Sequence, residues 1–183
     1  LKWIVDIIMV VCLSFILATY MLGKTTVVGH SMEPTLENAD SILIDKVSYC
    51  FKEPERYDVV VFVPNIANVS KYYVKRIVGL PGETVQIIDG LVYINGEPLE
   101  DDVIYSFDLK DEDGNEMEPE KIYNAGLASE PVTLGYDEYF VLGDNRNNSE
   151  DSRFANVGNV KYSSIIGRIW AVSAPFGRMG FVK

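Results

Sequence analysis

The chain opens with a long apolar run. Residues 3–22, WIVDIIMVVCLSFILATYML, are almost all apolar, with Asp6 near one end. As a helix this run rises about 30 Å, enough to cross the hydrocarbon core of a bilayer. A buried core helix and a cleavable signal peptide are the alternatives. The run is longer than a typical signal h-region and does not end in a small-x-small site. We therefore predict a membrane-spanning anchor over residues 1–23.

The flanks of this run carry little further information. Lys2 and Lys24 flank it evenly, so positive charge does not determine its orientation. The chain begins with Leu1 rather than methionine, and we expect a further N-terminal piece to precede it.

Beyond the anchor, the pattern of apolar positions has the period of β-strands. Apolar residues alternate with polar ones, or form short β-branched runs bounded by turn residues. Asp89-Gly90 lies between two such segments and predicts a tight hairpin. The expected strands are 25–28, 41–47, 58–63, 72–78, 84–88, 91–94, 139–142 and 165–172. No long helical period is present in residues 24–183. The prediction is therefore an all-β domain, a coiled sandwich or barrel-like core.

Residues 100–136 differ from this pattern. They are acidic, with Gly, Asn and Pro scattered through them, and have only short apolar patches. We expect a solvated excursion from the β core that supplies no group to the site. A calcium loop is the sharper alternative, because residues 111–115 are rich in oxygen ligands. Their spacing does not match the EF-hand pattern.

Charge narrows the class of partner. The net charge is −11, but residues 100–120 hold ten acidic residues and one lysine, so the rest of the chain carries only about −2. No basic stripe is available to neutralise phosphates, which argues against nucleic acid. Cys12 and Cys50 lie in the apolar run and near a strand end, so we expect no disulfide between them.

The candidate chemistry starts at residues 29–36, Gly-His-Ser-Met-Glu-Pro-Thr-Leu. A serine hydroxyl needs a base before it can act as a nucleophile. His30 is the sole histidine, and neighbours on a strand point to opposite faces, so it is poorly placed to serve Ser31. A lysine kept neutral by burial is the other possibility. Lys75 lies within an apolar and aromatic run, where burial would lower its pKa.

A third stretch, residues 143–153, reads GDNRNNSEDSR. Together, residues 29–36, 72–83 and 143–153 resemble, in order, the signature boxes of bacterial signal peptidase I. That family is a membrane-anchored Ser-Lys endopeptidase with a folded β core. The resemblance implies that Ser31 is the nucleophile and Lys75 the base. It also implies an N-terminus inside the cell and a catalytic domain on the extracytoplasmic side.

The same resemblance assigns supporting residues. Ser149 would hydrogen-bond Lys75 and orient it. Asp151 and Arg153 would form an ion pair. Asp144 would pair with Arg76 or Arg146, which leaves Arg76 with a structural role.

Two positions depart from the family pattern. Some members carry a second serine two residues before the nucleophile, where its hydroxyl helps to bind the oxyanion; here that position is Gly29. The Ser31 backbone N–H remains as a donor. Tyr57 stands where the family usually has glycine, in the turn before a strand.

The resemblance also implies the substrate. It would be an extended preprotein segment cut after a small-x-small sequence, bound by β-augmentation along an open strand. Met32, Ile42 and Val74 are the candidate pocket walls. No metal or cofactor is expected. The C-terminal apolar residues, expected either in the core or at the membrane interface, are Trp170, Phe176, Met179 and Phe181.

Other classes fit the sequence less well. A non-catalytic anchored β domain that binds a protein partner is the main alternative. A self-cleaving Ser-Lys regulator would carry a DNA-binding helical domain where this chain has the apolar run. A sortase-like transpeptidase needs a cysteine and a separate histidine, and no second histidine exists.

Overall fold

The computed structural model describes residues 2–65, 71–99, 102 and 120–182. Its first element is the helix α1 (Lys2–Met21), and the other elements are strands and short 3₁₀ helices. The strands are β1 (Leu22–Thr26), β2 (Ser41–Asp45), β3 (Val59–Phe62), β4 (Tyr73–Gly79), β5 (Thr84–Ile88), β6 (Leu91–Ile94), β7 (Glu97–Pro98), β8 (Val132–Thr133), β9 (Glu138–Leu142), β10 (Val160–Lys161), β11 (Ile165–Ala174) and β12 (Gly180–Phe181). The 3₁₀ helices are η1 (Ser48–Cys50), η3 (Gly126–Ser129), η4 (Tyr162–Ser164) and η5 (Phe176–Arg178). The prediction of a mostly β fold is confirmed.

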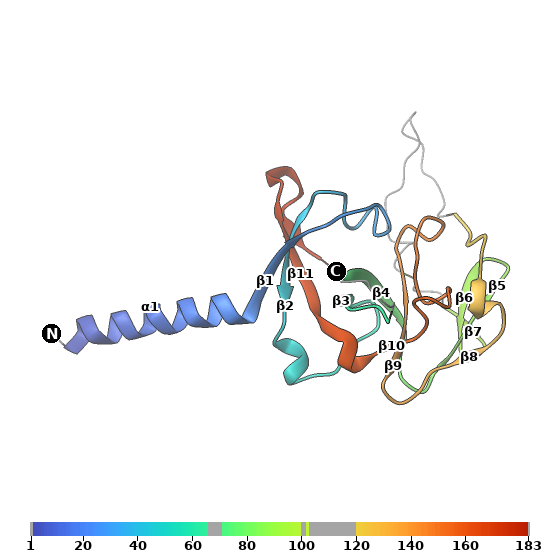
Figure 1. The fold of residues 1–183 in the computed structure, drawn as a ribbon, viewed down its shortest axis with the longest axis horizontal. Helices are drawn as coiled ribbons and strands as arrows, with labels where there is room; N and C mark the ends of the chain where they lie inside the picture. The colour runs from blue at the N-terminus through green and yellow to red at the C-terminus, as the bar shows by residue number, and fades with distance from the viewer. Residues whose placement is uncertain (1, 66–70, 100–101, 103–119, 183) are drawn as a thin grey trace.

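An eight-stranded antiparallel sheet forms the larger layer. Its order is β1-β2-β11-β3-β4-β9-β10, and β12 pairs with β11. The sheet curls in Figure 1, with β11 running through its middle. β3 has the sequence VVVF and is buried along its whole length. Such a run suits a central strand covered on both faces, and β3 lies between β11 and β4.

A smaller sheet of four strands, in the order β7-β6-β5-β8, lies beside the first (Figure 1). Asp89 and Gly90 both have positive φ and join β5 to β6 in the predicted tight hairpin. Asn95 and Gly96 make a second such turn, into β7. The core of this sheet is built from aliphatic side chains and Phe140.

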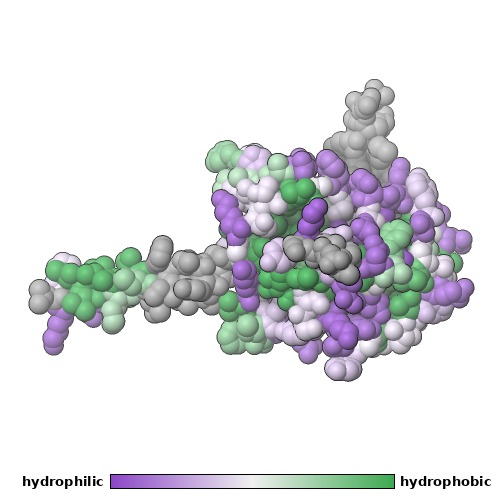
Figure 2. Space-filling view, viewed as in Figure 1, coloured by the Kyte–Doolittle hydropathy of each residue, from purple (hydrophilic) through white to green (hydrophobic). Residues whose placement is uncertain are grey.

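α1 extends away from the β domain and leads directly into β1 (Figure 1). The first half of the helix exposes eight large apolar side chains: Trp3, Ile4, Val5, Ile7, Ile8, Met9, Val10 and Val11. Figure 2 shows hydrophobic residues gathered on the surface of this half, with a few hydrophilic ones among them. Among the described residues, no helix combines the length and apolar character required of a membrane span. The anchor expected over residues 1–23 is thus present as a helix but is not found as a span.

Both ends of the predicted acidic excursion differ from expectation. Asp102 is buried at one end. Ile122, Ala128 and Leu134 are buried at the other, in the core of the smaller sheet. The last part of residues 100–136 therefore belongs to the folded domain, because three of its apolar residues are buried in that core. The candidate calcium loop at 111–115 lies outside the described residues.

Candidate active site

Ser31 lies on the loop between β1 and β2, which packing holds in place. Met32 and Leu36 are almost fully buried in the core of the larger sheet. The Leu36 N–H donates to the Met32 carbonyl at 2.9 Å, which closes the turn between them. Ser31 itself is half-buried. The apolar residues after Ser31 thus fix the loop while its hydroxyl stays accessible.

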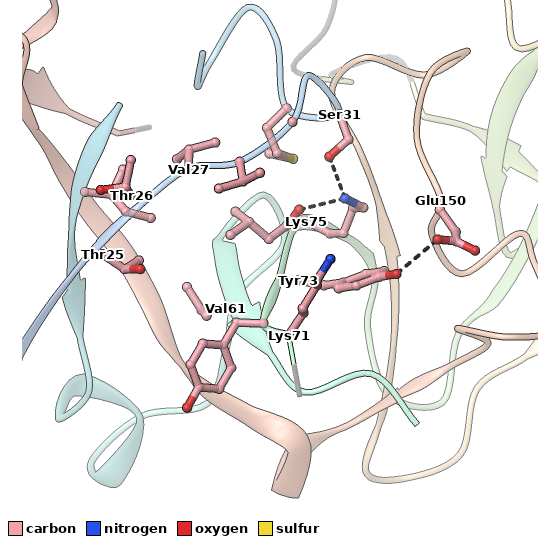
Figure 3. A pocket seen from close by; sticks show the side chains of 15 residues that line it. Thr25, Thr26, Val27, Ser31, Val61, Lys71, Tyr73, Lys75 and Glu150 are labelled. Carbon is pink, nitrogen blue, oxygen red and sulfur yellow. Dashed lines mark hydrogen bonds between the residues drawn. The ribbon is translucent and has the colours of Figure 1, made fainter. Parts of the chain in front are cut away.

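Lys75 reaches Ser31 from the larger sheet. On β4, Lys75 is opposite Val60 and Arg76 is opposite Val59 in the register with β3. Successive side chains on a strand point to opposite faces, so these two cations are separated. Lys75 Nζ lies 2.7 Å from Ser31 Oγ and 2.9 Å from the Val74 carbonyl oxygen. Figure 3 shows the two side chains pointing toward each other.

The environment of Lys75 favours its neutral form. The side chain is only 4% exposed, and burial lowers its pKa from 10.5 to about 8. The negative charges of Asp151, Asp144 and Glu150 act against this shift, while Arg153 supports it. A substantial fraction of Lys75 is therefore an unprotonated amine at mildly alkaline pH.

The aromatic neighbour of Lys75 is Tyr73. Its ring centroid lies 5.6 Å from Lys75 Nζ. Its hydroxyl donates to Glu150 at 3.0 Å, as Figure 3 shows. This contact links β4 to the segment 143–153, and nothing in the sequence pattern had indicated it.

His30 makes a different contact. Its Nδ1 lies 2.6 Å from Glu33 Oε1, and the histidine side chain is 58% exposed. The hydroxyl of Ser31 contacts Lys75 instead. The arrangement thus pairs the serine with the lysine, not with the adjacent histidine.

Arg76 forms a buried ion pair on the opposite face of β4. Its Nε and Nη2 donate to the two carboxylate oxygens of Asp144 at 2.8 and 2.7 Å. Both side chains are fully buried. Thr35 donates to Asp144 Oδ2 at 2.5 Å and lies 3.2 Å from Arg76 Nη2. The pair therefore connects β4 and the segment 143–153 with the loop that carries Ser31, residues 27–40, which we call the serine loop. We had expected Asp144 to pair with Arg76 or Arg146, and the structure pairs it with Arg76.

The segment 143–153 also forms direct hydrogen bonds with the serine loop. The Asn145 N–H donates to the Ser31 carbonyl oxygen at 3.1 Å, and Asn145 Nδ2 donates to the His30 carbonyl oxygen at 3.1 Å. A Cβ on Gly143 would lie 2.4 Å from the Ser31 carbonyl oxygen, so only glycine permits this approach. The role of Asn145 was missed in the sequence, although it lies within one of the quoted boxes.

Asp151 and Arg153 form a further buried ion pair. Arg153 Nε and Nη2 donate to Asp151 at 2.7 and 2.8 Å. Asp151 Oδ2 also accepts the Gly143 N–H at 3.1 Å. This pair thus supports the backbone that contacts Ser31.

Ser149 departs from the expected contact. Its buried Oγ has no hydrogen-bond partner among the described residues, and it packs against Gly143. The hydrogen bonds of Lys75 Nζ go to Ser31 and to the Val74 carbonyl instead. In this structure, the amine is oriented by its own strand rather than by Ser149.

Arg146 has a partner that the sequence did not suggest. Its Nη1 and Nη2 donate to Asp102 at 2.6 and 2.7 Å, and both side chains are buried. We expected residues 100–136 to supply no group to the site, but Asp102 binds Arg146, one of the predicted supporting residues. One carboxylate among ten acidic residues carried no distinguishing signal in the sequence.

A groove of about 530 Å³ opens beside Ser31 and Lys75. Residues 25–29 form one side and residues 71–75 the other, as seen in Figure 3. The four residues considered for substrate binding all line it: Gly29, Met32, Ile42 and Val74.

Known proteins resemble this chain over most of its length. The family model described as "Signal peptidase, peptidase S26" matches residues 1–174. This chain belongs to that family. Signal peptidase I of Leptolyngbya laminosa is 38% identical over 176 residues, which cover 93% of this chain and 77% of that protein. Signal peptidase I T of Bacillus subtilis (strain 168) is 33% identical over 185 residues, which cover 100% of this chain and 90% of that protein.

A solved structure is also similar. The crystal structure of a signal peptidase I from Enterococcus faecalis V583 is 36% identical, with a TM-score of 0.45, and the match covers 64% of this chain and 97% of that one. Membership of the signal peptidase family makes the chain a hydrolase of the serine protease class, and supports the removal of signal peptides.

The two departures from the family pattern have distinct backbone settings. Gly29 has φ +107°, and a Cβ there would meet nothing within 4 Å. A serine at this position has room but would require a strained backbone. Tyr57 has φ +73°, the left-handed region that favours glycine, and its carbonyl oxygen accepts from Arg76 Nη1 at 2.8 Å.

The C-terminal segment lies beyond residue 174, where the match to the signal peptidase family model ends. Arg178 donates to the buried Asp40 at 3.1 Å and to Glu37 at 2.7 Å. These two contacts attach the C-terminal segment to the second half of the serine loop. We expected four apolar residues near the C-terminus either in the core or at the membrane interface. All four are exposed in the structure: Trp170, Phe176, Met179 and Phe181. Their side chains therefore do not belong to the core of the β domain.

Proposed function

We propose that this chain is a membrane-associated endopeptidase that removes signal peptides with a Ser31–Lys75 dyad. The observation that carries the proposal is the 2.7 Å distance between Ser31 Oγ and the buried amine of Lys75. A nucleophile within hydrogen-bond reach of a base with a lowered pKa is the arrangement that activates a serine.

The first step is acylation. A neutral amine has two N–H donors and one lone pair. One N–H is occupied by the Val74 carbonyl oxygen, which turns the lone pair toward Ser31. Lys75 accepts the Ser31 proton as Oγ attacks the scissile carbonyl carbon. The backbone N–H of Ser31 is the proposed donor to the resulting oxyanion. Protonated Lys75 then gives its proton to the leaving amine, and the C–N bond breaks.

The second step is hydrolysis of the acyl-enzyme. Lys75 takes a proton from a water molecule, and the hydroxide attacks the ester carbonyl. Collapse of the intermediate breaks the bond to Ser31 Oγ, which recovers the proton from Lys75. The cycle needs no group beyond the dyad, a donor for the oxyanion and water.

The groove supports an extended peptide as the substrate. Residues 25–29 and 71–75 line it, and these ranges include the end of β1 and the start of β4. Extended strands beside a groove suit β-augmentation. Met32, Ile42 and Val74 line the same groove as Ser31 and Lys75, and they are the proposed walls of pockets for small side chains. We therefore propose cleavage after an Ala-x-Ala sequence.

Membrane association follows from α1. Eight large apolar side chains of its first half are exposed, from Trp3 to Val11, and no part of the β domain covers them (Figure 2). Burying such side chains in lipid is favourable by roughly 1.5–3 kcal/mol each. We propose that α1 binds the lipid of the cell membrane and that the β domain lies on the extracytoplasmic side. Removal of residues 2–21 should release the protein from vesicles in a flotation assay.

The deciding experiment is cleavage of a preprotein that carries an Ala-x-Ala site by the purified protein in detergent. The wild type should cut at that site, and Ser31→Ala should lose several orders of magnitude in rate, as nucleophile removal does in serine proteases with a catalytic triad. His30→Ala is the matched control and should keep most of the activity. A non-catalytic binding domain would instead bind the preprotein without cutting it, and Ser31→Ala would change nothing.

A further inference from the structure

Asp102 is a buried charged residue that has no role in the proposed chemistry. It is 4% exposed, and its two carboxylate oxygens accept from Arg146 Nη1 and Nη2. Arg146 is equally buried. A bidentate ion pair of this kind fixes the plane of the guanidinium as well as its position.

Arg146 in turn holds the main chain next to the nucleophile. Its Nε donates to the Gly143 carbonyl oxygen at 3.1 Å. The Gly143 N–H is held from the other side by Asp151, so both polar groups of this peptide segment are fixed. Gly143 packs against the Ser31 carbonyl oxygen so closely that no Cβ would fit.

The same arginine also touches the charges around Lys75. The Arg146 carbonyl oxygen accepts from Arg153 Nη2 at 2.6 Å, and Arg153 binds Asp151. The charged groups that act on Lys75 are Asp151, Asp144, Glu150 and Arg153. A displacement of Arg146 would therefore disturb both the Ser31 loop and the charges that set the protonation of Lys75.

We propose that Asp102 is a positioning residue for peptide-bond cleavage: it fixes Arg146, and Arg146 fixes Gly143 against the loop that carries Ser31. The inference rests on the proposed function of the Ser31–Lys75 pair. It assigns a role to one residue of a segment that otherwise reads as a solvated acidic loop.

The test is Asp102→Asn, which keeps the shape of the side chain and removes its charge. Glu130→Gln is the control, because Glu130 is an exposed carboxylate. For preprotein cleavage in detergent, kcat should fall about 10-fold in Asp102→Asn, the range usual for groups that orient an active site, while KM changes little. Glu130→Gln should behave as the wild type.

The pH profile separates positioning from stability alone. Without Asp102, the positive charge of Arg146 is uncompensated and can compete with Arg153 for Asp151. Both effects disfavour protonated Lys75, so the acidic limb of the profile should move to lower pH. Asp102→Glu keeps the ion pair and should recover most of kcat together with the wild-type limb. A purely structural Asp102 would lower the melting temperature and leave the limb where it was.

A second variant guards against loss of the fold. Asp102→Leu combined with Arg146→Met replaces the buried ion pair by apolar groups, a change that often leaves stability intact. The Gly143 carbonyl oxygen still loses its donor, so kcat should remain low. The proposal is overturned if either folded variant cuts at the wild-type rate with the wild-type pH limb. If Ser31→Ala itself remained active, the proposed function would fail instead, whatever the Asp102 variants did.

Discussion

The two sheets of this protein use their interiors differently. The smaller sheet, β5–β8, encloses a core of aliphatic side chains and Phe140. Along the larger sheet and the loops beside it lie the buried charges of the described residues: Asp40, Lys75, Arg76, Asp102, Asp144, Arg146, Asp151 and Arg153. Burying a charge is costly unless it is paired, and all but Lys75 have an oppositely charged partner. Lys75 is also the group whose pKa is lowered, and it contacts Ser31, the proposed nucleophile.

This contrast gives each region a distinct response to substitution. Changes in the smaller sheet should cost stability and leave the chemistry alone. Changes in the larger sheet should affect the chemistry, the buried charge balance, or both.

The largest effect is expected at Lys75. Lys75→Arg keeps a positive charge but should be inactive, because a guanidinium does not lose its proton in this range. Lys75→Met should be equally inactive yet fold well, since methionine resembles a buried neutral lysine in shape. Single-turnover cleavage and circular dichroism would measure the two properties. Substantial activity in Lys75→Arg would mean that another group takes the proton from Ser31.

The pH dependence of the wild type follows from the same group. Because burial lowers the pKa of Lys75 to about 8, the neutral amine that we propose as the base is scarce below that pH. Activity should rise about tenfold per pH unit on the acidic side and level off above pH 8. A profile of kcat/KM between pH 6 and 10 would show this limb; a midpoint near the pKa of an ordinary histidine would contradict it.

The next largest effect concerns the ion pair on the other face of β4. Arg76→Met leaves Asp144 buried without its cation, which should lower the free energy of unfolding by about 3–5 kcal/mol. Adding Asp144→Leu should restore most of that loss. Urea unfolding of the single and double variants would decide the matter, since equal losses in both would show that the pair is not coupled.

A smaller loss of stability is expected in the aliphatic core. Val85 is fully buried in β5, and Val85→Ala should cost about 2 kcal/mol. The dyad is untouched, so kcat and KM should stay at wild-type values when the assay is run below the melting temperature. A selective loss of kcat would link the smaller sheet to the site.

The smallest effects come from two positions with positive φ, one in each region. Ala39, exposed in the serine loop, has φ +72°, and Ala39→Gly should stabilise the fold by about 0.5–1 kcal/mol. Gly82, in the turn before β5, has φ +80° and open space around it. Gly82→Ala should destabilise by a similar amount. Thermal unfolding would test whether the two changes have opposite signs.

Much of the fold could be predicted because the strands carry strong local patterns. The boundaries of β5 and β6 were predicted to the residue, since Asp89-Gly90 marks the hairpin between them. The two-residue strands β7, β8, β10 and β12 were missed, because segments so short have no period to detect. Their pairing is set by neighbours distant in the sequence.

The residues of the candidate site were easier to predict from the sequence than the contacts among them. The apolar run around Lys75 made it a candidate base for Ser31, but alternation alone could not say whether Lys75 or Arg76 faces the serine, and only the family resemblance chose Lys75. Asp102 lies in a segment with no local pattern. Its significance appears only when the fold places it against Arg146.

The alternation of Lys75 and Arg76 on β4 has a consequence for quality control during folding. A strand that pairs one residue out of register turns every side chain to the opposite face. Such a slip would present Val74 or Arg76 to Ser31 in place of Lys75, and neither can accept a proton from it. With the Ser31–Lys75 pair as the proposed dyad, a one-residue slip of β4 therefore gives an inactive molecule rather than one with misdirected activity.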